Sequence, residues 1–80
     1  MPYFVYVLLC EDGSYYTGSA KNVNFRFKQH AKGYGARYTK IHKPSRVVYV
    51  EKFTTHREAL RREKAIKSLT RKKKQILVNS

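Results

Sequence analysis

The chain has 80 residues, which is enough for a single domain spanning residues 1–80. Its one cysteine, Cys10, excludes an intramolecular disulfide and favours a reducing, cytoplasmic compartment, and the longest apolar run, Phe4 to Cys10, is too short to span a membrane. The 18 Lys and Arg residues outweigh the 5 Asp and Glu residues, for a net charge of +13, and every base lies at or after Lys21. A phosphate-rich partner is therefore favoured over a membrane, a secreted disulfide scaffold or a multidomain enzyme.

The first segment of the chain has the composition of a central β-strand. Residues 3–9 are aromatic and β-branched, which favours a strand, and they are apolar at both odd and even positions. A strand with two apolar faces is covered on both sides, so we expect it in the middle of its sheet. An Asp-Gly turn signal follows, and residues 15–18 are predicted to form the returning strand.

The length of the turn decides which side chains share a face of the sheet. A three-residue loop at residues 11–13, with its glycine left-handed, pairs Cys10 with Ser14. This register predicts Tyr6 and Tyr16 on one face, whereas a two-residue loop would separate them, because a one-residue slip exchanges the faces.

A first helix is predicted after the hairpin. Asn22 or Asn24 can cap it, and Gly33 ends it. Arg26 and His30 are four residues apart, so their side chains point to the same side of the helix. The apolar positions that we expect to face inward are Val23, Phe27 and Ala31.

The second half of the chain is predicted as loop, strand and two helices. Residues 33–45 read as a basic, aromatic loop with glycines, and residues 46–53 as a third strand. Thr55 and Glu58 form a capping box that opens the second helix, and Thr70 can cap a short last helix. The positions that we expect to face inward are Leu60, Ile66 and Leu69, followed by Ile76 and Leu77.

One acidic residue interrupts the inward stripe of the second predicted helix. Glu63 comes three residues after Leu60 and three before Ile66, so helical spacing places its carboxylate toward the core or a cleft. An inward carboxylate is costly unless it is paired or binds a cation. Periodicity alone leaves two interpretations open: a structural salt bridge, for example to Arg26, and a functional carboxylate.

The polar residues on these elements form a set that suits phosphodiester cleavage. Arg26 can offset the charge of the pentacovalent phosphate, and a tyrosine or His30 can act as general base near the attacking water. Glu63 can hold Mg²⁺ with water in the remaining positions. With only 5 acids in the chain, the sequence supports a one-metal mechanism rather than a two-metal one.

The order of these residues resembles that of the GIY-YIG nuclease domain. The first motif reads Phe4-Val5-Tyr6 and the second Tyr16-Thr17-Gly18, with a turn of the usual length between them. A helix carrying Arg26 and His30 follows, and Glu63 on the later helix matches the metal-binding glutamate of that family. The resemblance covers nearly the whole chain.

Two further segments are similar to a small, single-domain bacterial branch of that family. They are residues 35–39 and residues 69–71, and the branch is similar to the catalytic part of structure-specific endonucleases. The resemblance implies an α+β fold: a three-stranded antiparallel sheet flanked by about three helices, in the order β-β-α-β-α-α. It also implies a divalent-metal-dependent endonuclease that hydrolyses DNA phosphodiester bonds, with a role in DNA repair or recombination.

The resemblance also implies a role for each matched residue. Tyr6 would position the water or act as general base, and Tyr16 would bind or orient the scissile phosphate. Arg26 would stabilise phosphate charge, and His30 would assist proton transfer or hydrogen-bond a tyrosine. Glu63 would hold a single Mg²⁺ or Mn²⁺ ion.

The sequence departs from the family pattern at two places. Phe4 occupies the position of the glycine in the first motif. Many members also have an asparagine near the end of the domain, and the candidates for it here are only Asn79 and, by substitution, Gln75.

Gly18 matches the glycine of the second motif. It would allow the backbone to approach closely at the end of the strand.

The predicted partner is DNA, with branched, flapped or single-stranded regions as targets and with RNA as a further candidate. Tyr38 either stacks on a base or pins the loop to the domain, and Arg37 and Lys40 either contact phosphate or are simply solvated. The candidate nucleic-acid contacts are Lys21, Arg37, Tyr38, Lys40, Arg61 and Lys72.

Two functions compete with that of an endonuclease. One is a non-catalytic nucleic-acid-binding module of the same fold, and the other is a basic interaction protein associated with ribosomal RNA. A pure binder has no need for an inward carboxylate on a surface of positive charge, so the presence of Glu63 favours the nuclease. Because the sequence shows no appended DNA-binding domain, we expect target choice to come from this domain or from a protein partner.

Overall fold

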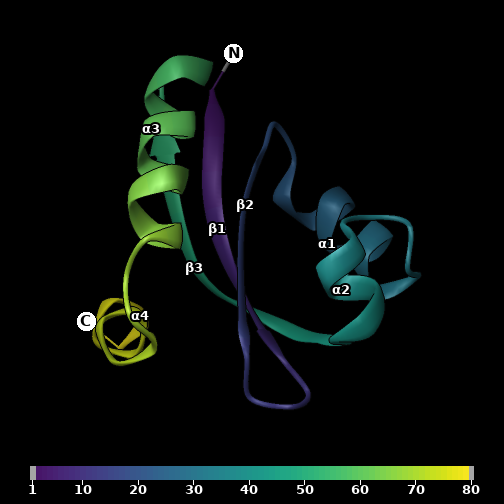
Figure 1. The fold of residues 1–80 in the computed structure, drawn as a ribbon. Helices are drawn as coiled ribbons and strands as arrows, with labels where there is room; N and C mark the ends of the chain where they lie inside the picture. The colour runs from purple at the N-terminus through teal and green to yellow at the C-terminus, as the bar shows by residue number, and fades with distance from the viewer. Residues whose placement is uncertain (1, 80) are drawn as a thin grey trace.

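The structure is a computed structural model that describes residues 2–79. Three strands and four helices follow one another within these residues (Figure 1). In chain order they are β1 (Tyr3–Cys10), β2 (Tyr15–Ala20), α1 (Val23–Ala31), α2 (Arg37–Ile41), β3 (Pro44–Phe53), α3 (His56–Lys67) and α4 (Arg71–Val78). The expected α+β class is confirmed, and the short helix α2 is an addition within the segment predicted as loop.

The sheet has β1 in its centre. The strand order is β2-β1-β3, and both pairings are antiparallel. Four consecutive β1 residues, Val5 to Leu8, are at most 1% exposed. Burial on both faces follows from their apolar character at odd and even positions and confirms the predicted central position.

The turn between β1 and β2 has the predicted three-residue length. The Cys10 amide donates to the Ser14 carbonyl at 2.8 Å, and the Gly13 amide donates to the Cys10 carbonyl at 2.9 Å. Gly13 has a φ of +85°, the left-handed conformation that this loop requires. The resulting register pairs Tyr6 with Gly18 and places Tyr16 on the same face of the sheet as Tyr6.

Helices cover both faces of the sheet. On one face, Val5 and Val7 form a buried cluster with Ala59 and Ile66 of α3. The other face is covered by α1 and α2, whose buried residues include His30, and Figure 1 shows these helices on the side of the sheet opposite to α3. Side chains from the two helical layers can therefore meet only around the outer strands, β2 and β3.

Both longer helices begin at residues that the sequence identifies. The Asn22 side chain accepts from the Phe25 amide at 3.0 Å, so Asn22 rather than Asn24 caps α1. The Thr55 hydroxyl accepts from the Glu58 amide at 3.2 Å at the start of α3. These caps satisfy amides that have no partner within the helix.

The inward faces of these helices differ in part from the predicted stripes. Ala31 is exposed and His30 is buried instead, because α1 turns its polar histidine toward the tyrosines. Leu60 is 47% exposed, whereas the neighbouring Ala59 is fully buried. A methyl group allows α3 to approach the central strand closely, and the larger leucine lies outside that contact.

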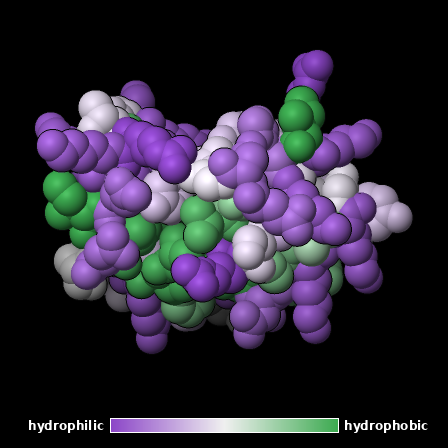
Figure 2. Space-filling model, turned by 90° about the horizontal axis from the view of Figure 1, so that it is seen from below, coloured by the Kyte–Doolittle hydropathy of each residue, from purple (hydrophilic) through white to green (hydrophobic). Residues whose placement is uncertain are grey.

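The exterior is mainly hydrophilic. Figure 2 shows one face on which hydrophilic side chains surround an apolar patch. None of the helices within residues 2–79 has the length and apolar character needed to cross a membrane.

Replacing Gly13 tests the turn. Gly13→Ala places a β-carbon on a residue with φ of +85°, and we expect a loss of about 1–2 kcal/mol in the free energy of unfolding. Urea denaturation of the variant, with Glu11→Ala in the same exposed turn as the control, measures this loss. Equal stability of the two variants would contradict the left-handed assignment.

Candidate active site

Tyr6 reaches the β2 edge of the sheet by passing over a glycine. A β-carbon built at Gly18 would lie 2.5 Å from the Tyr6 hydroxyl oxygen and 2.7 Å from Cζ of the same ring. Because Gly18 is the partner of Tyr6 on the outer strand, the tyrosine ring crosses that strand and its hydroxyl lies toward the edge. Only glycine leaves this path open.

His30 lies where the two tyrosines meet. Its Nε2 is 2.9 Å from the Tyr6 hydroxyl oxygen, and its ring centroid is 5.0 Å from that of Tyr16. The His30 side chain is held in the interior, since the residue is only 2% exposed. The predicted gathering of Tyr6, Tyr16 and His30 is therefore present in the structure.

The second nitrogen of His30 is held by the segment that enters α2. The Ala36 amide donates to Nδ1 at 3.3 Å, and the Thr39 hydroxyl oxygen lies 2.7 Å from the same atom. Thr39 also donates to the Ala36 carbonyl at 2.9 Å. Gly35 makes room for the ring, because a β-carbon there would lie 2.0 Å from Nδ1.

The hydrogen bonds on the far side of the ring correspond to two tautomers of His30. If the single hydroxyl proton of Thr39 goes to Nδ1, the imidazole proton is on Nε2, which donates to the Tyr6 oxygen. If that proton goes to the Ala36 carbonyl, Nδ1 donates to Thr39, and Nε2 accepts from the Tyr6 hydroxyl. In both tautomers His30 holds the Tyr6 hydroxyl, which makes it a positioning residue for Tyr6.

Burial controls the protonation of the cluster. It lowers the pKa of His30, and the nearby Arg26 charge lowers the same pKa further. Burial raises the pKa of Tyr6, as does Tyr16 beside it, while the Arg26 guanidinium acts in the opposite direction. Burial also raises the pKa of Tyr16, and the Lys67 ammonium partly offsets this rise. At neutral pH the imidazole is uncharged and both hydroxyls keep their protons.

Arg26 extends the cluster to the surface. It lies on α1 one turn before His30 and is exposed. Its Nη1 donates weakly to Gln29 at 3.4 Å, and a hydrogen bond from the guanidinium to Tyr6 lowers the pKa of that hydroxyl. The remaining N–H donors are available to a ligand.

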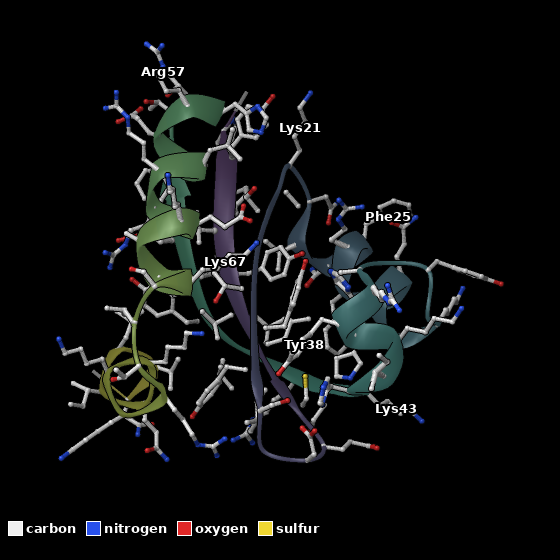
Figure 3. The ribbon with its side chains drawn as sticks, viewed as in Figure 1. Lys21, Phe25, Tyr38, Lys43, Arg57 and Lys67 are labelled. Carbon is white, nitrogen blue, oxygen red and sulfur yellow. The ribbon has the colours of Figure 1, made fainter. Side chains whose placement is uncertain are left out.

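Glu63 approaches the tyrosines from the opposite layer. Its side chain is 17% exposed, and one carboxylate oxygen lies 2.8 Å from the Lys67 ammonium. The carboxylate charge adds to the raised pKa of both Tyr6 and Tyr16, as a smaller cause than burial, so Glu63 lies near enough to act on both hydroxyls. Figure 3 shows Lys67 pointing from α3 toward β2. The inward direction of Glu63 is present as predicted, and its salt-bridge partner is Lys67 rather than Arg26.

The carboxylate suits a hard divalent ion that keeps most of its water. Residues 2–79 contain no group of three or more His, Cys, Asp or Glu side chains that could hold a metal ion. A preformed protein cage is therefore outside what these residues offer. A single carboxylate, with water and substrate phosphate as the other ligands, fits the way in which Mg²⁺ is commonly bound.

Tyr38 pins α2 to the sheet. Its ring stacks on Tyr16 with centroids 5.8 Å apart and on His42 with centroids 4.3 Å apart. Figure 3 shows Tyr38 between α2 and β2. Of its two predicted roles, these contacts support the structural one.

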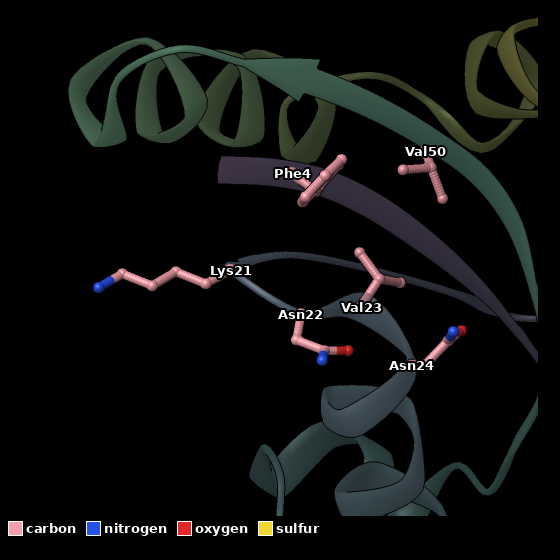
Figure 4. A pocket seen from close by; sticks show the side chains of 6 residues that line it. All are labelled: Phe4, Lys21, Asn22, Val23, Asn24 and Val50. Atoms are coloured by element: carbon pink, nitrogen blue, oxygen red, sulfur yellow. The ribbon is translucent and has the colours of Figure 1, made fainter. Parts of the chain in front are cut away.

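Phe4 lies apart from the tyrosine cluster. It lines a cavity of about 310 Å³ beside the start of α1, together with Lys21 and Val50 (Figure 4). The Lys21 ammonium lies 5.5 Å from the centroid of the Tyr3 ring. The position that is glycine in the family motif is thus occupied here by a packing side chain.

The other predicted contact residues are spread over the surface. Arg37 and Lys40 are exposed on α2. Arg61 lines a hollow on α3 with Leu60, and Lys72 lines another on α4. Gln75 and Asn79, the candidates for the late asparagine, share the hollow of Lys72. The structure does not bring these α3 and α4 residues to the tyrosines.

Sequence reasoning missed several residues of the cluster. Gly35 and Thr39 contact a histidine that precedes them by 5 and 9 residues, across a bend that no local pattern predicts. Lys67 had a readable signal, because it follows Glu63 by four residues on one helix.

Comparison with known proteins decides the family. Residues 2–75 match the family described as GIY-YIG catalytic domain. The chain belongs to the GIY-YIG family. This membership assigns it to a superfamily of nuclease type and suggests a nucleic acid as substrate. GIY-YIG nucleases generally use divalent metal ions.

Relatives from bacteria share both sequence and fold with this GIY-YIG chain. A UPF0213 protein from Staphylococcus aureus is 51% identical over 76 residues, which cover 95% of this chain and 93% of that protein. The solution structure of a UPF0213 protein from Bacillus halodurans is 46% identical, with a TM-score of 0.63, and covers 99% of this chain and 84% of that one. A solution structure of a protein from E. faecalis is 38% identical, with a TM-score of 0.66 and the same coverage.

Adding a methyl group at Gly18 tests the path of Tyr6. Gly18→Ala forces the tyrosine ring to move, and we expect a loss of about 1–3 kcal/mol in the free energy of unfolding from overpacking. Urea denaturation measures it, with Ser19→Ala on the same strand as the control. Adding Tyr6→Phe should restore part of the loss, because the nearest clash is with the hydroxyl; a fully stable Gly18→Ala would contradict the arrangement.

The lowered pKa of His30 predicts a pH-dependent stability. Above a pH of about 6.5 the histidine is neutral in both states, and as the pH falls through this value only the unfolded chain takes up the proton. The free energy of unfolding should therefore decrease on acidification, by at most about 1.4 kcal/mol per pH unit from this group. Urea denaturation between pH 7.5 and about 5.5 measures the slope, which should flatten in His30→Gln and persist in the control His56→Gln. An NMR titration of His30 with a midpoint above its ordinary value would contradict the prediction.

Proposed function

We propose that this protein is a divalent-metal-dependent endonuclease that hydrolyses phosphodiester bonds of DNA. The observation that carries the proposal is the meeting of two tyrosines, a histidine and an arginine with one inward carboxylate at the β2 edge. Tyr6 and His30 are joined by a hydrogen bond of 2.9 Å, and Glu63 on the other layer lies near enough to raise the pKa of Tyr6. A partly buried carboxylate beside two tyrosines on a basic surface favours a functional site over a packing contact.

Tyr6 has the geometry to position the attacking water. Its oxygen is held 2.9 Å from His30 Nε2 and would accept a hydrogen bond from the attacking water. Where Nε2 is the unprotonated nitrogen, a water proton taken up by the Tyr6 oxygen is balanced by transfer of the hydroxyl proton of Tyr6 to Nε2, which gives an imidazolium. Tyr16, beside the same imidazole, is placed to orient the scissile phosphate.

Arg26 supplies positive charge to the reacting phosphate. Its guanidinium is exposed and lies near the Tyr6 hydroxyl, whose pKa it lowers. Two parallel N–H donors match two phosphate oxygens, and charge that develops in the transition state is stabilised most by donors held in place beforehand.

Glu63 would hold the Mg²⁺ or Mn²⁺ ion. The ion supplies Lewis-acid stabilisation of phosphate charge when bound. Lys67 now neutralises the carboxylate, and its half-exposed side chain is free to turn toward a phosphate oxygen when the carboxylate is otherwise engaged. The pair thus gives Glu63 a partner before substrate arrives.

Charge and exposed aromatic rings support a nucleic-acid substrate with unpaired bases. The net charge is +13, and Phe25 and Tyr34 are 58% and 77% exposed. Rings of this kind can stack on splayed bases, which duplex interiors do not offer. We propose branched or single-stranded DNA as substrate, a role in DNA repair or recombination in the cytoplasm, and a protein partner for targeting. The surface contacts that we propose for this substrate are Lys21, Arg37, Lys40 and Arg61, with Lys72 adding general positive charge and Tyr38 holding α2 against the sheet.

A non-catalytic binding module is the second candidate. The observation that favours it is the Glu63–Lys67 ion pair at 2.8 Å, which satisfies the carboxylate without any metal ion. In that case the edge would bind nucleic acid and leave it intact.

A cleavage assay separates the two candidates. The parent protein is incubated with single-stranded, duplex and branched DNA and with RNA, in Mg²⁺ or Mn²⁺. We expect cleavage that Arg26→Ala lowers by about 10²–10³-fold, as for a lost donor to transition-state charge, and that Glu63→Ala lowers at least as much. The matched controls Lys28→Ala and Glu11→Ala remove the same charges from exposed positions and should leave the rate unchanged.

Three results of this assay would contradict the proposal. Cleavage that survives both Arg26→Ala and Glu63→Ala would show that the assigned site is wrong. Binding of every substrate without any cutting would favour the non-catalytic module. Preferential cutting of RNA would overturn DNA as the substrate.

A further inference from the structure

A second hollow lies along the same sheet edge, at the start of β2. It has a volume of about 190 Å³ and is lined by Ser14, Tyr15, Tyr38, Arg71 and Lys74. We call it the Tyr15 groove. Its walls come from three separate parts of the chain, namely the end of the β1–β2 turn, α2 and the first turn of α4.

Two cations line the Tyr15 groove. The Arg71 guanidinium lies 5.8 Å from the centroid of the Tyr15 ring and beside the turn at Gly13, so its position is held by an aromatic face. Lys74 follows Arg71 by three residues on α4 and therefore projects on the same side of that helix.

The acid nearest in sequence is engaged elsewhere. Asp12 forms an ion pair with His42 and accepts a hydrogen bond of 2.6 Å from the Ser14 hydroxyl. Because its carboxylate is already partnered, the positive charge of Arg71 is available to an external anion. No acidic side chain lines the groove within the described residues 2–79.

The groove is continuous with the tyrosine cluster. Tyr38 lines the groove and stacks on Tyr16, which contacts His30. The stacked rings of Tyr38 and Tyr16 thus link the Tyr15 groove to the tyrosine cluster.

We propose that the Tyr15 groove binds a phosphate of the substrate strand that flanks the scissile one, with Arg71 and Lys74 as its ligands. This inference rests on the proposed function, because the strand is the one held at the tyrosine cluster. The volume is about six times the share of one water molecule in the liquid, which is room for a hydrated phosphate group. A bidentate guanidinium beside a mobile ammonium is a common phosphate-binding pair.

The test compares charge-matched variants of one helix. Arg71→Gln, Lys74→Gln and the control Lys72→Gln each remove one positive charge from α4, but Lys72 lines a different hollow. Affinity for a fluorescently labelled single-stranded oligonucleotide is measured by anisotropy in EDTA over a series of salt concentrations. Binding in EDTA is independent of cleavage.

We expect the two groove variants to lose about tenfold more affinity than the control, which corresponds to about 1.4 kcal/mol for a directed contact. Lys72→Gln should show only the general electrostatic loss, with a salt slope lower by about one. Equal losses in all three variants would overturn the groove. Thermal unfolding of each variant checks the fold, and Arg71→Lys, which keeps the charge without the fork, should fall between parent and Arg71→Gln.

NMR titration separates a strand phosphate from a free anion. A 5′-phosphorylated dinucleotide should shift the amides of residues 13–15 and 71–74, and inorganic phosphate at the same concentration should shift them less. Equal shifts by inorganic phosphate would overturn the assignment to a strand.

The two proposals fail separately. If the parent cuts no substrate but Lys74→Gln still binds more weakly than Lys72→Gln, the endonuclease is wrong and the groove stands. If the parent cuts DNA but Arg71→Gln and Lys74→Gln bind the oligonucleotide as well as the control Lys72→Gln does, the groove is wrong and the endonuclease stands.

Discussion

The hydrogen bond between Tyr6 and His30 joins the central strand to the helix that covers it, and the candidate site depends on this bond. It forms only because Gly18 leaves the tyrosine a path across the outer strand and Gly35 leaves room for the imidazole. Thr39 and the neighbouring backbone then hold the far side of the ring. The result is a tyrosine hydroxyl held in a fixed position against the imidazole beside the outer strand.

The edge is the place where this fold can assemble chemistry from both of its layers. The faces of the sheet are closed by helices, so polar groups from opposite faces can meet only around an outer strand. Arg26 comes from one layer and the Glu63–Lys67 pair from the other. In a chain of net charge +13, one carboxylate held by a lysine is the group that distinguishes this stretch of edge from a surface that only attracts phosphate.

Most of the fold was predictable because its signals are local. The left-handed Gly13 and the caps at Asn22 and Thr55 depend on conformations that only a few residue types adopt or stabilise. The helix at 37–41 was missed because it has five residues, too few for a periodic pattern. Leu60 was wrongly predicted to face inward. The spacing of apolar residues indicates roughly which side of a helix faces the core, but it does not decide between neighbouring positions such as Ala59 and Leu60.

The sequence by itself determined that a strand, an Asp-Gly turn and a returning strand follow one another, and helical spacing predicted that Glu63 points inward. It favoured a register with Tyr6 and Tyr16 on one face, which the three-residue turn of the structure confirms. Only the tertiary structure decided that Lys67 is the partner of that carboxylate and that Thr39 holds the histidine. Which side chain becomes the partner of Glu63 or His30 depends on how closely the helices pack on the sheet and on the small residues that allow this packing. Such packing forms only in the folded protein, where residues distant in the sequence compete for the same space.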